Sequence, residues 1–202
     1  MAHLFDPLTI RETTFMNRVW VSPMCMYSAE NGVIQEFHHA HLGAFITGGA
    51  GLVIVEATGV VPEGRISIGC PGLYTNEQAE AFVPIVNLAH SFGVKMGIQL
   101  AHAGRKGSTT QMAIGKSDHL IATPEEGGWE TVAPSPLAFE GYPVPRELTV
   151  AEIKQLVKDW ADAASRAIKA GFDVLEIHAA HGYLLHEFYS PLTNHRTDEY
   201  GG

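Results

Sequence analysis

Two histidines and a tyrosine within six residues are the most chemically suggestive feature of this sequence. His178, His181 and Tyr183 follow a short apolar segment, residues 174–177, and stand in a run that contains a glycine. Two imidazoles three residues apart can grip one oxygen atom, and a phenol two residues further on can donate a proton nearby. Such a set can polarise a carbonyl group and protonate a neighbouring carbon. A helix carrying His-x-x-His could instead hold a metal ion, so the surrounding fold must decide.

The segments around these residues alternate between predicted strands and predicted helices. Nearly continuous apolar runs are typical of strands buried on both faces, while helical spacing and capping boxes indicate helices. The predicted strands are 18–23, 52–57, 95–100 and 173–177. The predicted helices are 37–49, one that opens at Thr75 and closes at Gly93, one that opens at Thr149 and closes at Gly171, and a short one at 185–190.

The three longer helices each have an apolar face. In the helix that opens at Thr75, it is Ala79, Phe82, Val83, Val86 and Ala89. In the helix 37–49, apolar or small residues at near-helical spacing are Phe37, Ala40, His41, Ala44 and Phe45. In the helix that opens at Thr149, the expected buried face is Ile153, Leu156, Val157, Trp160, Ala164 and Ala167. Amphipathic helices of this kind cover the outside of a parallel sheet.

Four strand–helix units predict an α/β fold, either a doubly wound sheet or a (β/α)₈ TIM barrel. No Gly-x-Gly-x-x-Gly turn follows the first strand, which weakens the dinucleotide-binding version of the doubly wound sheet. Reactive side chains stand just past the strand ends, where barrels and open parallel sheets both keep their sites. A barrel needs eight units and roughly 250 residues. We therefore expect residues 1–202 to be the amino-terminal half of a single larger domain whose remainder is absent.

Residues 104–146 form a long excursion after the third predicted strand. The segment has little periodicity, is rich in Gly, Pro, Ser and Thr, and contains Trp129. An excursion of this length inside a compact domain is usually a functional lid or a disordered segment. Because it begins at the end of a strand, we expect a lid over the site.

Composition narrows the class of protein. Hydrophobic residues make up 46 % and charged residues 17 % of the chain, and the formal charge is -9. The negative charge disfavours nucleic acid or an anionic membrane as the main partner. No apolar run reaches membrane-spanning length, and the first residues lack the pattern of a signal peptide. Two cysteines form no disulfide framework, so a cytoplasmic location is expected.

Five motifs, in order along the chain, resemble those of the old yellow enzyme family of FMN-dependent ene-reductases. They are Ser22–Tyr27, Val55–Thr58, Gln99–Lys106, His178–Tyr183 and Ser190–Gly202. The sequence most resembles the thermophilic-like (class III) branch, which cysteine at position 25 marks, where other branches more often have threonine. The resemblance implies a TIM barrel with FMN at its mouth and the flavin ring across the strand ends.

The resemblance also implies a role for particular residues. Those that would line one side of the flavin ring are Ser22, Pro23, Met24 and Cys25. Those that would bond the polar edge of the flavin are Ala57 and Gln99. Those that would hold the substrate carbonyl are Tyr27, His178 and His181. The proton donor would be Tyr183.

The implied reaction is oxidoreductase chemistry in two half-reactions. NADPH or NADH would reduce FMN, and the flavin would then reduce the activated C=C bond of an α,β-unsaturated carbonyl compound by ping-pong hydride transfer. Enones and enals are the expected substrates, with nitro compounds as alternative acceptors. Family members of this branch tend to form dimers or tetramers, so a homo-oligomer is expected for the full-length protein.

Two rival interpretations stay open. The 202-residue chain could be an inactive half-barrel, or could need a second chain to close the barrel, because the fourth strand would be left with an exposed edge. A metal-dependent hydrolase could use the histidine pair, although no third or fourth ligand with recognisable spacing accompanies it. Arg105, Lys106 and Arg196 could bind the phosphate of NADPH or form ion pairs within loops. No chemistry is expected of Cys70.

Overall fold

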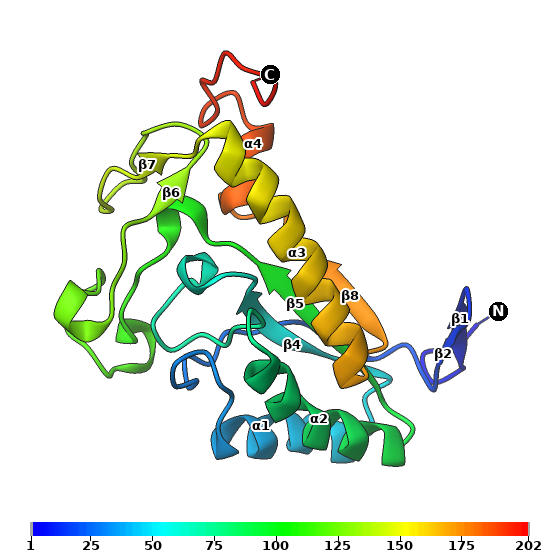
Figure 1. Ribbon diagram of the computed structural model, residues 1–202. Helices are drawn as coiled ribbons and strands as arrows, with labels where there is room; N and C mark the ends of the chain where they lie inside the picture. Colours follow the sequence, from blue (N-terminus) through cyan, green and yellow to red (C-terminus); the bar gives the residue numbers. More distant parts are fainter. Residues whose placement is uncertain (1, 202) are drawn as a thin grey trace.

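A four-stranded parallel sheet organises the protein, whose computed structural model describes residues 2–201 (Figure 1). Met1 and Gly202, which the expected domain and the last motif include, lie outside the described residues. The strands lie in the order β3-β4-β5-β8, so neighbours in the sheet are successive strands of the strand–helix repeat. Their bounds are Trp20–Val21, Leu52–Gly59, Lys95–Ala101 and Val174–Ile177.

Three helices connect these strands, and a fourth follows the last one. Their bounds are α1 Glu36–Thr47, α2 Asn76–Ser91, α3 Val150–Ala170 and α4 Leu184–Tyr189. The strand order contains no reversal, and right-handed crossovers that always step in one direction place every connecting helix on the same face of the sheet. A doubly wound sheet reverses its order and has helices on both faces. The observed order is therefore that of a barrel segment, in agreement with the predicted strand–helix alternation.

The predicted helix boundaries rest on capping interactions that the structure confirms. Thr75 Oγ1 accepts a hydrogen bond from the Gln78 N–H at 3.2 Å, and Gln78 Oε1 accepts one from the Thr75 N–H at 3.1 Å. Thr149 and Glu152 repeat this reciprocal arrangement at the start of α3. At the other end of α3, Gly171 adopts φ +96°, a left-handed conformation that glycine adopts without steric cost.

The buried face of α1 differs from the expected one. Its buried residues are His38, Leu42 and Ile46, whereas Phe37 is 45 % exposed. His38 sets this rotation, because its Nε2 lies 3.3 Å from a carboxylate oxygen of the buried Glu56. In α3 the expectation was wrong for Val157, which is 62 % exposed. Helical spacing does not encode the contact between His38 and Glu56, because the two residues lie on separate elements.

Two short strand pairs were not expected from the sequence. β1, Leu8–Ile10, and β2, Thr13–Phe15, form an antiparallel hairpin that projects from the sheet, at the right of Figure 1. β6, Val132–Ala133, pairs in parallel with β7, Arg146–Glu147. The second pair ties the two halves of the excursion 104–146 together, close to the point where it ends.

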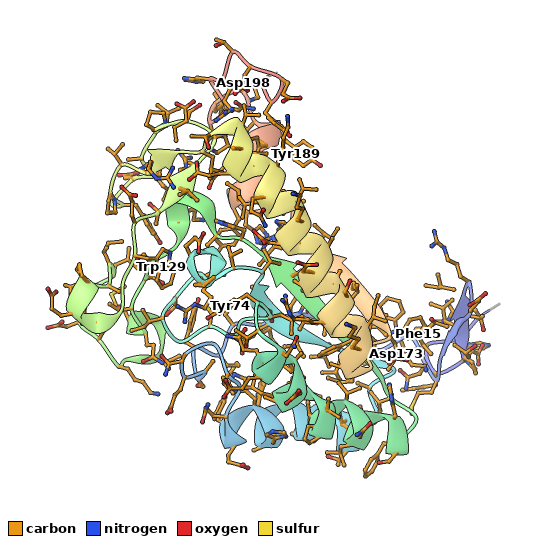
Figure 2. The ribbon with its side chains drawn as sticks, in the orientation of Figure 1. Phe15, Tyr74, Trp129, Asp173, Tyr189 and Asp198 are labelled. Atoms are coloured by element: carbon orange, nitrogen blue, oxygen red, sulfur yellow. The ribbon has the colours of Figure 1, made fainter. Side chains whose placement is uncertain are left out.

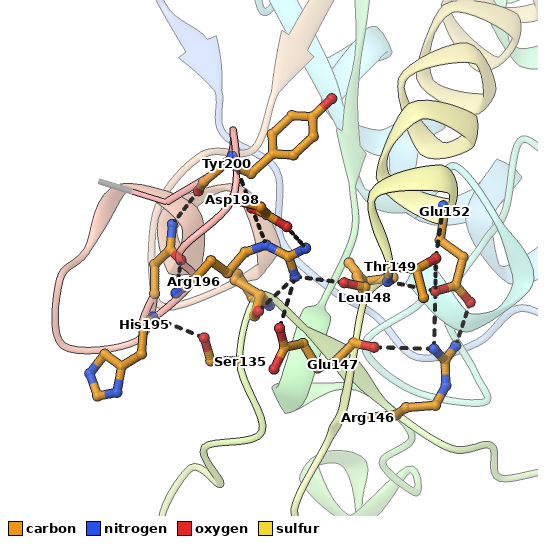
Figure 3. Close-up of polar contacts among 12 residues, drawn as sticks. Ser135, Arg146, Glu147, Leu148, Thr149, Glu152, His195, Arg196, Asp198 and Tyr200 are labelled. Carbon is orange, nitrogen blue, oxygen red and sulfur yellow. Dashed lines mark hydrogen bonds and ion pairs between the residues drawn. The ribbon is translucent and has the colours of Figure 1, made fainter.

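The excursion 104–146 is an ordered segment with three short 3₁₀ helices, and Figure 2 shows Trp129 in it. Arg196 anchors its end: the Arg196 guanidinium donates to the Pro134 carbonyl at 3.0 Å and to the Leu148 carbonyl at 2.6 Å (Figure 3). The same side chain pairs with Asp198 at 2.5 Å and is only 3 % exposed. Arg196 therefore joins the end of the excursion to residues 196–198 through hydrogen bonds and an ion pair, which is one of the two roles predicted for it.

In the described part of the chain, no helix combines the length and the apolar character needed to cross a membrane.

Asp173 should stabilise the amino-terminal end of the sheet, at the start of β8 (Figure 2). Its carboxylate accepts hydrogen bonds from Lys95 Nζ, the Met96 N–H and His90 Nε2 at 2.8–2.9 Å. Burial alone would raise the pKa of Asp173, but these bonds hold it below the usual value. We expect Asp173→Asn to lower the free energy of unfolding by about 1–2 kcal/mol at pH 7.

The pH dependence of this effect follows from the direction of the shift. A lowered pKa in the folded state contributes stability above the unfolded pKa of about 3.9, and the contribution is lost as pH falls through the folded value. Urea unfolding at pH 7 and below pH 3 should therefore show a variant effect that shrinks in acid. Asp162→Asn, at an exposed position on α3, is the matched control. An Asp173→Asn effect that persists unchanged in acid would contradict this account.

Candidate active site

The four parallel strands end at one edge of the sheet, and most of the predicted site residues follow these ends. The segment 22–27 follows β3, Ala57 lies near the end of β4, and Gln99 lies near the end of β5. The segment 178–183 follows β8. The strand ends therefore bring together four segments that lie far apart in the sequence.

His178, His181 and Tyr183 form one aromatic cluster. The His178 ring centroid lies 5.3 Å from that of His181 and 4.9 Å from that of Tyr183, and both pairs are nearly perpendicular. The His178 N–H donates to the Leu100 carbonyl at 2.9 Å and so fixes the start of this loop to β5. His181 adopts φ +59°, a left-handed conformation uncommon for residues other than glycine, at the turn that precedes Gly182. The three residues singled out by spacing are therefore neighbours in space.

The hydrogen bonds of His178 define which of its ring nitrogens can donate. Its Nδ1 accepts a hydrogen bond from the Ala180 N–H at 3.3 Å, which assigns the proton of the neutral ring to Nε2. Burial lowers the pKa of His178, and the nearby His181 adds to the effect. Near neutral pH this residue is therefore a neutral imidazole with an Nε2–H donor.

Tyr183 lies against a small apolar cluster at the strand ends. The buried members of this cluster are Ala57, Ile66, Cys70, Ala101 and Ala103, and the half-buried side chains that pack against it are Cys25, Tyr27 and Tyr183. Burial raises the pKa of Tyr183 and raises that of Tyr27 to about 12. Both phenols therefore keep their protons at neutral pH, which a proton donor requires.

Lys106 contacts the same aromatic cluster. Its Nζ donates to the His181 carbonyl at 2.9 Å and lies 4.9 Å from the centroid of the Tyr183 ring. It also lies 4.7 Å from the centroid of the Phe139 ring, in the excursion 104–146. Arg105 instead donates to the carbonyls of Leu137 and Ala138. Arg105 therefore holds the excursion, whereas Lys106 joins the excursion to the loop that carries the histidines.

Replacing Lys106 with methionine should lower the free energy of unfolding by about 1–2 kcal/mol. The substitution keeps the length of the side chain but removes the bond to the His181 carbonyl and the cation over the Tyr183 ring, each worth about 1 kcal/mol or less. Urea unfolding would measure the effect. Lys116→Met, at an exposed position of the excursion, is the control. Equal free energies of unfolding for the two variants would contradict the role of Lys106 as a link between the excursion and the histidine loop.

A β-bulge lies where Ala57 and Gln99 face each other. Val55 pairs with Ile98 and Thr58 pairs with Leu100, so Glu56 and Ala57 together lie opposite Gln99. A bulge leaves backbone groups outside the regular ladder, as is common next to active sites. The buried Gln99 donates one N–H to Glu176 Oε1 at 2.8 Å, which leaves its second N–H and its amide oxygen. These donors and acceptors suit the pyrimidine edge of a flavin.

The segment 22–27 offers an accessible surface beside this bulge. Ser22 and Met24 are exposed, and Pro23 and Cys25 are half-buried. The segment is held to β4 because the Met26 N–H donates to Glu56 Oε2 at 2.9 Å. Residues 22–25 are therefore fixed in place and still accessible to a ligand.

Two further residues at the strand ends have structural roles. His102 is buried, its Nδ1 accepts from the Gly104 N–H at 3.1 Å, and burial lowers its pKa to about 4. The Thr58 hydroxyl donates to the Glu56 carbonyl at 2.8 Å. Both side chains form hydrogen bonds with backbone groups at the strand ends.

Several residues near the site were not identified from the sequence. Tyr142, in the excursion, packs edge-to-face on Phe139, and after burial it adds to the raised pKa of Tyr27 and of Tyr183. Glu187, on α4, is buried, accepts a hydrogen bond from the Arg105 N–H and has its pKa raised to about 8 by burial. For Tyr142 and Phe139, the available signal was the presence of aromatic residues in an otherwise polar, glycine-rich excursion.

Potential metal ligands gather elsewhere in the site. Within residues 2–201, ligand atoms of Cys25, Glu56 and Cys70 lie within 4.8 Å of one another, and this group does not include the histidine pair. The two histidines instead lie beside two other hydrogen-bond donors, the Tyr183 hydroxyl and the Lys106 ammonium group.

Comparisons with known proteins identify the family. The profile of the NADH:flavin oxidoreductase / NADH oxidase family matches residues 3–202. The chain belongs to this family, which includes the old yellow enzymes. An NADH:flavin oxidoreductase of Gibberella zeae is 50 % identical to it over 203 residues, which cover 98 % of this chain and 49 % of that protein. An NADPH dehydrogenase of Bacillus subtilis is 46 % identical over 202 residues, which cover 98 % and 54 %.

Solved structures of similar proteins confirm the fold class. Morphinone reductase superposes with a TM-score of 0.83 at 32 % identity, over 98 % of this chain and 54 % of that one. The old yellow enzyme homologue of Zymomonas mobilis superposes with a TM-score of 0.82 at 36 % identity, over 100 % and 55 %. The fold is thus the α/β architecture of these TIM-barrel enzymes. The chain spans about half the length of each of these four relatives.

Proposed function

We propose that the protein is the amino-terminal half of an FMN-dependent NAD(P)H oxidoreductase of the class III branch, which reduces the activated C=C bond of α,β-unsaturated carbonyl compounds. The observation that carries the proposal is the contact of His178 with both His181 and Tyr183, at the end of a barrel strand. The assigned Nε2–H of His178 and the protonated phenol of Tyr183 supply two different proton donors at this place. Cys25, the residue that supports assignment to the class III branch, packs against the same apolar cluster as Tyr183.

The residues at the strand ends fit a flavin. Those proposed to line one side of the ring are Ser22, Pro23, Met24 and Cys25, and those proposed to bond its polar edge are Ala57 and Gln99. The bulge opposite Gln99 supports this assignment, because it interrupts the regular pairing of β4 and β5 beside a buried amide. When bound, FMN would accept hydride from NADPH or NADH and supply it to the β-carbon of the substrate.

The residues of this chain orient the substrate and handle its charge. His178 and His181 would donate hydrogen bonds to the substrate carbonyl oxygen, and Tyr27 would help to hold the substrate. Negative charge builds on that oxygen during the reaction, so fixed donors stabilise the transition state more than the ground state. Tyr183 would then transfer its hydroxyl proton to the α-carbon. Its pKa is high, but the carbanion that it protonates is far more basic.

The excursion 104–146 would act as a lid that excludes water and shapes the substrate pocket. Lys106 supports this role because it connects the excursion to the histidine loop, and Arg105 supports it because it ties the start of the excursion to Leu137. An enone, an enal or a nitro compound is the proposed substrate class, since the same donors can hold a carbonyl or a nitro oxygen. We further propose a cytoplasmic enzyme that forms a homo-oligomer in its full-length form.

A second possibility is that the 202-residue chain is inactive by itself and needs a complementary part. β8 lies at the edge of the sheet, and Ile177 on it is 60 % exposed. A separate apolar hollow of about 320 Å³ lies between α3 and α4, with Leu156, Trp160 and Phe188 in its lining. Apolar surface at an open sheet edge is typical of a face that another segment covers.

Retention of FMN separates these two proposals. The purified 202-residue chain is mixed with excess FMN and desalted, and its visible absorbance is measured. About one flavin per chain, with NADPH-dependent reduction of an enone, supports activity of this chain alone. A colourless chain that binds FMN only when it is co-expressed with the part of the Bacillus subtilis relative that it does not cover supports the second proposal. Absence of FMN binding in both preparations would contradict the proposed function.

A further inference from the structure

The two cysteines of the chain come from distant segments and lie together at the strand ends. Both are free thiols, and their sulfur atoms lie within 4.8 Å of each other. Cys70 is 0 % exposed, whereas Cys25 is partly accessible. The neighbouring Cys25 thiol, together with burial, raises the pKa of Cys70. One accessible and one buried thiol are therefore in contact.

The backbone around the cysteines holds the two segments in this arrangement. The Ala29 N–H donates to the Gly69 carbonyl at 2.8 Å, and a Cβ at Gly69 would collide with the Tyr27 carbonyl oxygen. That carbonyl also accepts a hydrogen bond from Gln111 Nε2. The Cys70 N–H donates to the Ser67 carbonyl at 3.0 Å, which closes the turn that carries the buried thiol. These backbone contacts hold the segment of Cys25 close to the segment of Cys70.

We propose that Cys25 and Cys70 are a modification site, where a peroxide converts the two thiols into an intramolecular disulfide. The accessible Cys25 reacts first: its sulfur bonds to one peroxide oxygen, the O–O bond breaks, and water leaves. The Cys70 sulfur then attacks the oxidised Cys25 sulfur. The S–S bond forms, the S–O bond breaks, and the hydroxide takes the Cys70 proton and leaves as water. The two thiols lose two electrons in total, and one peroxide is reduced to two waters.

This reaction would change the proposed flavin surface, a consequence that rests on the proposed function. Cys25 belongs to the segment 22–25 that is proposed to line the ring. A disulfide would turn the Cys25 sulfur toward Cys70 and remove its S–H. Neither the sulfur atom nor the S–H group could then contact the flavin. The pair would thereby make the site sensitive to peroxide.

Mass spectrometry tests the disulfide without any flavin or activity. The native chain is treated with hydrogen peroxide, and remaining thiols are alkylated under denaturing conditions before proteolysis. The expected result is the loss of two hydrogen atoms from the chain, a linked peptide pair containing Cys25 and Cys70, and reversal by dithiothreitol. Cys70→Ser should instead accumulate oxygen on Cys25, and Cys25→Ser should leave Cys70 alkylated.

Three results with the native chain would overturn the proposal. The first is a Cys25 that carries oxygen atoms while Cys70 stays alkylated. The second is a disulfide between two chains, seen as a dimer on a non-reducing gel. The third is full alkylation of both cysteines after peroxide treatment. None of these results bears on whether the protein holds FMN, which the desalting experiment measures separately.

Discussion

Replacing Tyr183 with phenylalanine should slow enone reduction by the FMN-loaded protein by about 10²- to 10⁴-fold, the usual contribution of a positioned acid. The substitution removes only the hydroxyl group, so the ring can keep its contact with His178 and its place against the apolar cluster. The reduction of the loaded protein by NADPH does not use the α-proton and should change by less than about twofold. Stopped-flow absorbance of each half-reaction measures the two rates separately.

The separation of the two half-reactions makes this prediction specific. Tyr189→Phe is the matched control, because Tyr189 is a 75 % exposed phenol at the end of α4. Its two rates should equal those of the unmodified protein. Equal slowing of both half-reactions in Tyr183→Phe would indicate a disturbed site rather than a lost acid. An unchanged rate of enone reduction would rule out Tyr183 as the proton donor.

Replacing His178 with alanine should lower the rate of enone reduction by about 10²- to 10³-fold, as for the loss of one donor to a developing oxyanion. The effect is expected because the Ala180 N–H occupies Nδ1 and leaves Nε2–H as the donor. His178→Asn keeps a side-chain N–H and should recover part of the rate. His3→Ala, at an exposed position near the amino terminus, is the control. Equal rates for the alanine and asparagine variants would contradict the role of His178 as a hydrogen-bond donor.

The pH dependence of enone reduction tests the protonation state of His178. Burial and His181 lower its pKa, so the ring is neutral at and above the ordinary value of about 6.5. A neutral donor predicts a rate that is flat as pH rises from about 6.5 to 8. A rate that falls through this range, and that becomes flat in His178→Asn, would mean that the imidazolium is the active form.

The sequence predicted those features that local patterns and strand ends determine. Capping boxes at Thr75 and Thr149 located the starts of α2 and α3, and the structure shows the expected bonds at both. The histidines and Tyr183 were predicted to act together, and they are in contact because they follow one strand within six residues. Parallel strands that end at one edge then bring Ala57 and Gln99 together.

Features that depend on distant contacts could not be predicted from the sequence. The rotation of α1 follows from the contact between His38 and Glu56, and these two residues lie on separate elements. Lys106 meets Phe139 only because residue 139 returns to the start of the excursion, and that segment has no periodicity to place its aromatic residues. The contact between Cys25 and Cys70 likewise depends on two loops that are joined through Ala29 and Gly69.

The central claim is that these strand ends form a flavin-dependent carbonyl-polarising site. The most direct test starts from the FMN-loaded protein, as the chain alone or with its complementing part, reduced by NADPH without oxygen. An enone is then added, and both the flavin absorbance and the saturated ketone are measured. The account predicts that the oxidised flavin spectrum returns with one saturated ketone formed per flavin. A flavin that stays reduced with excess enone would contradict it.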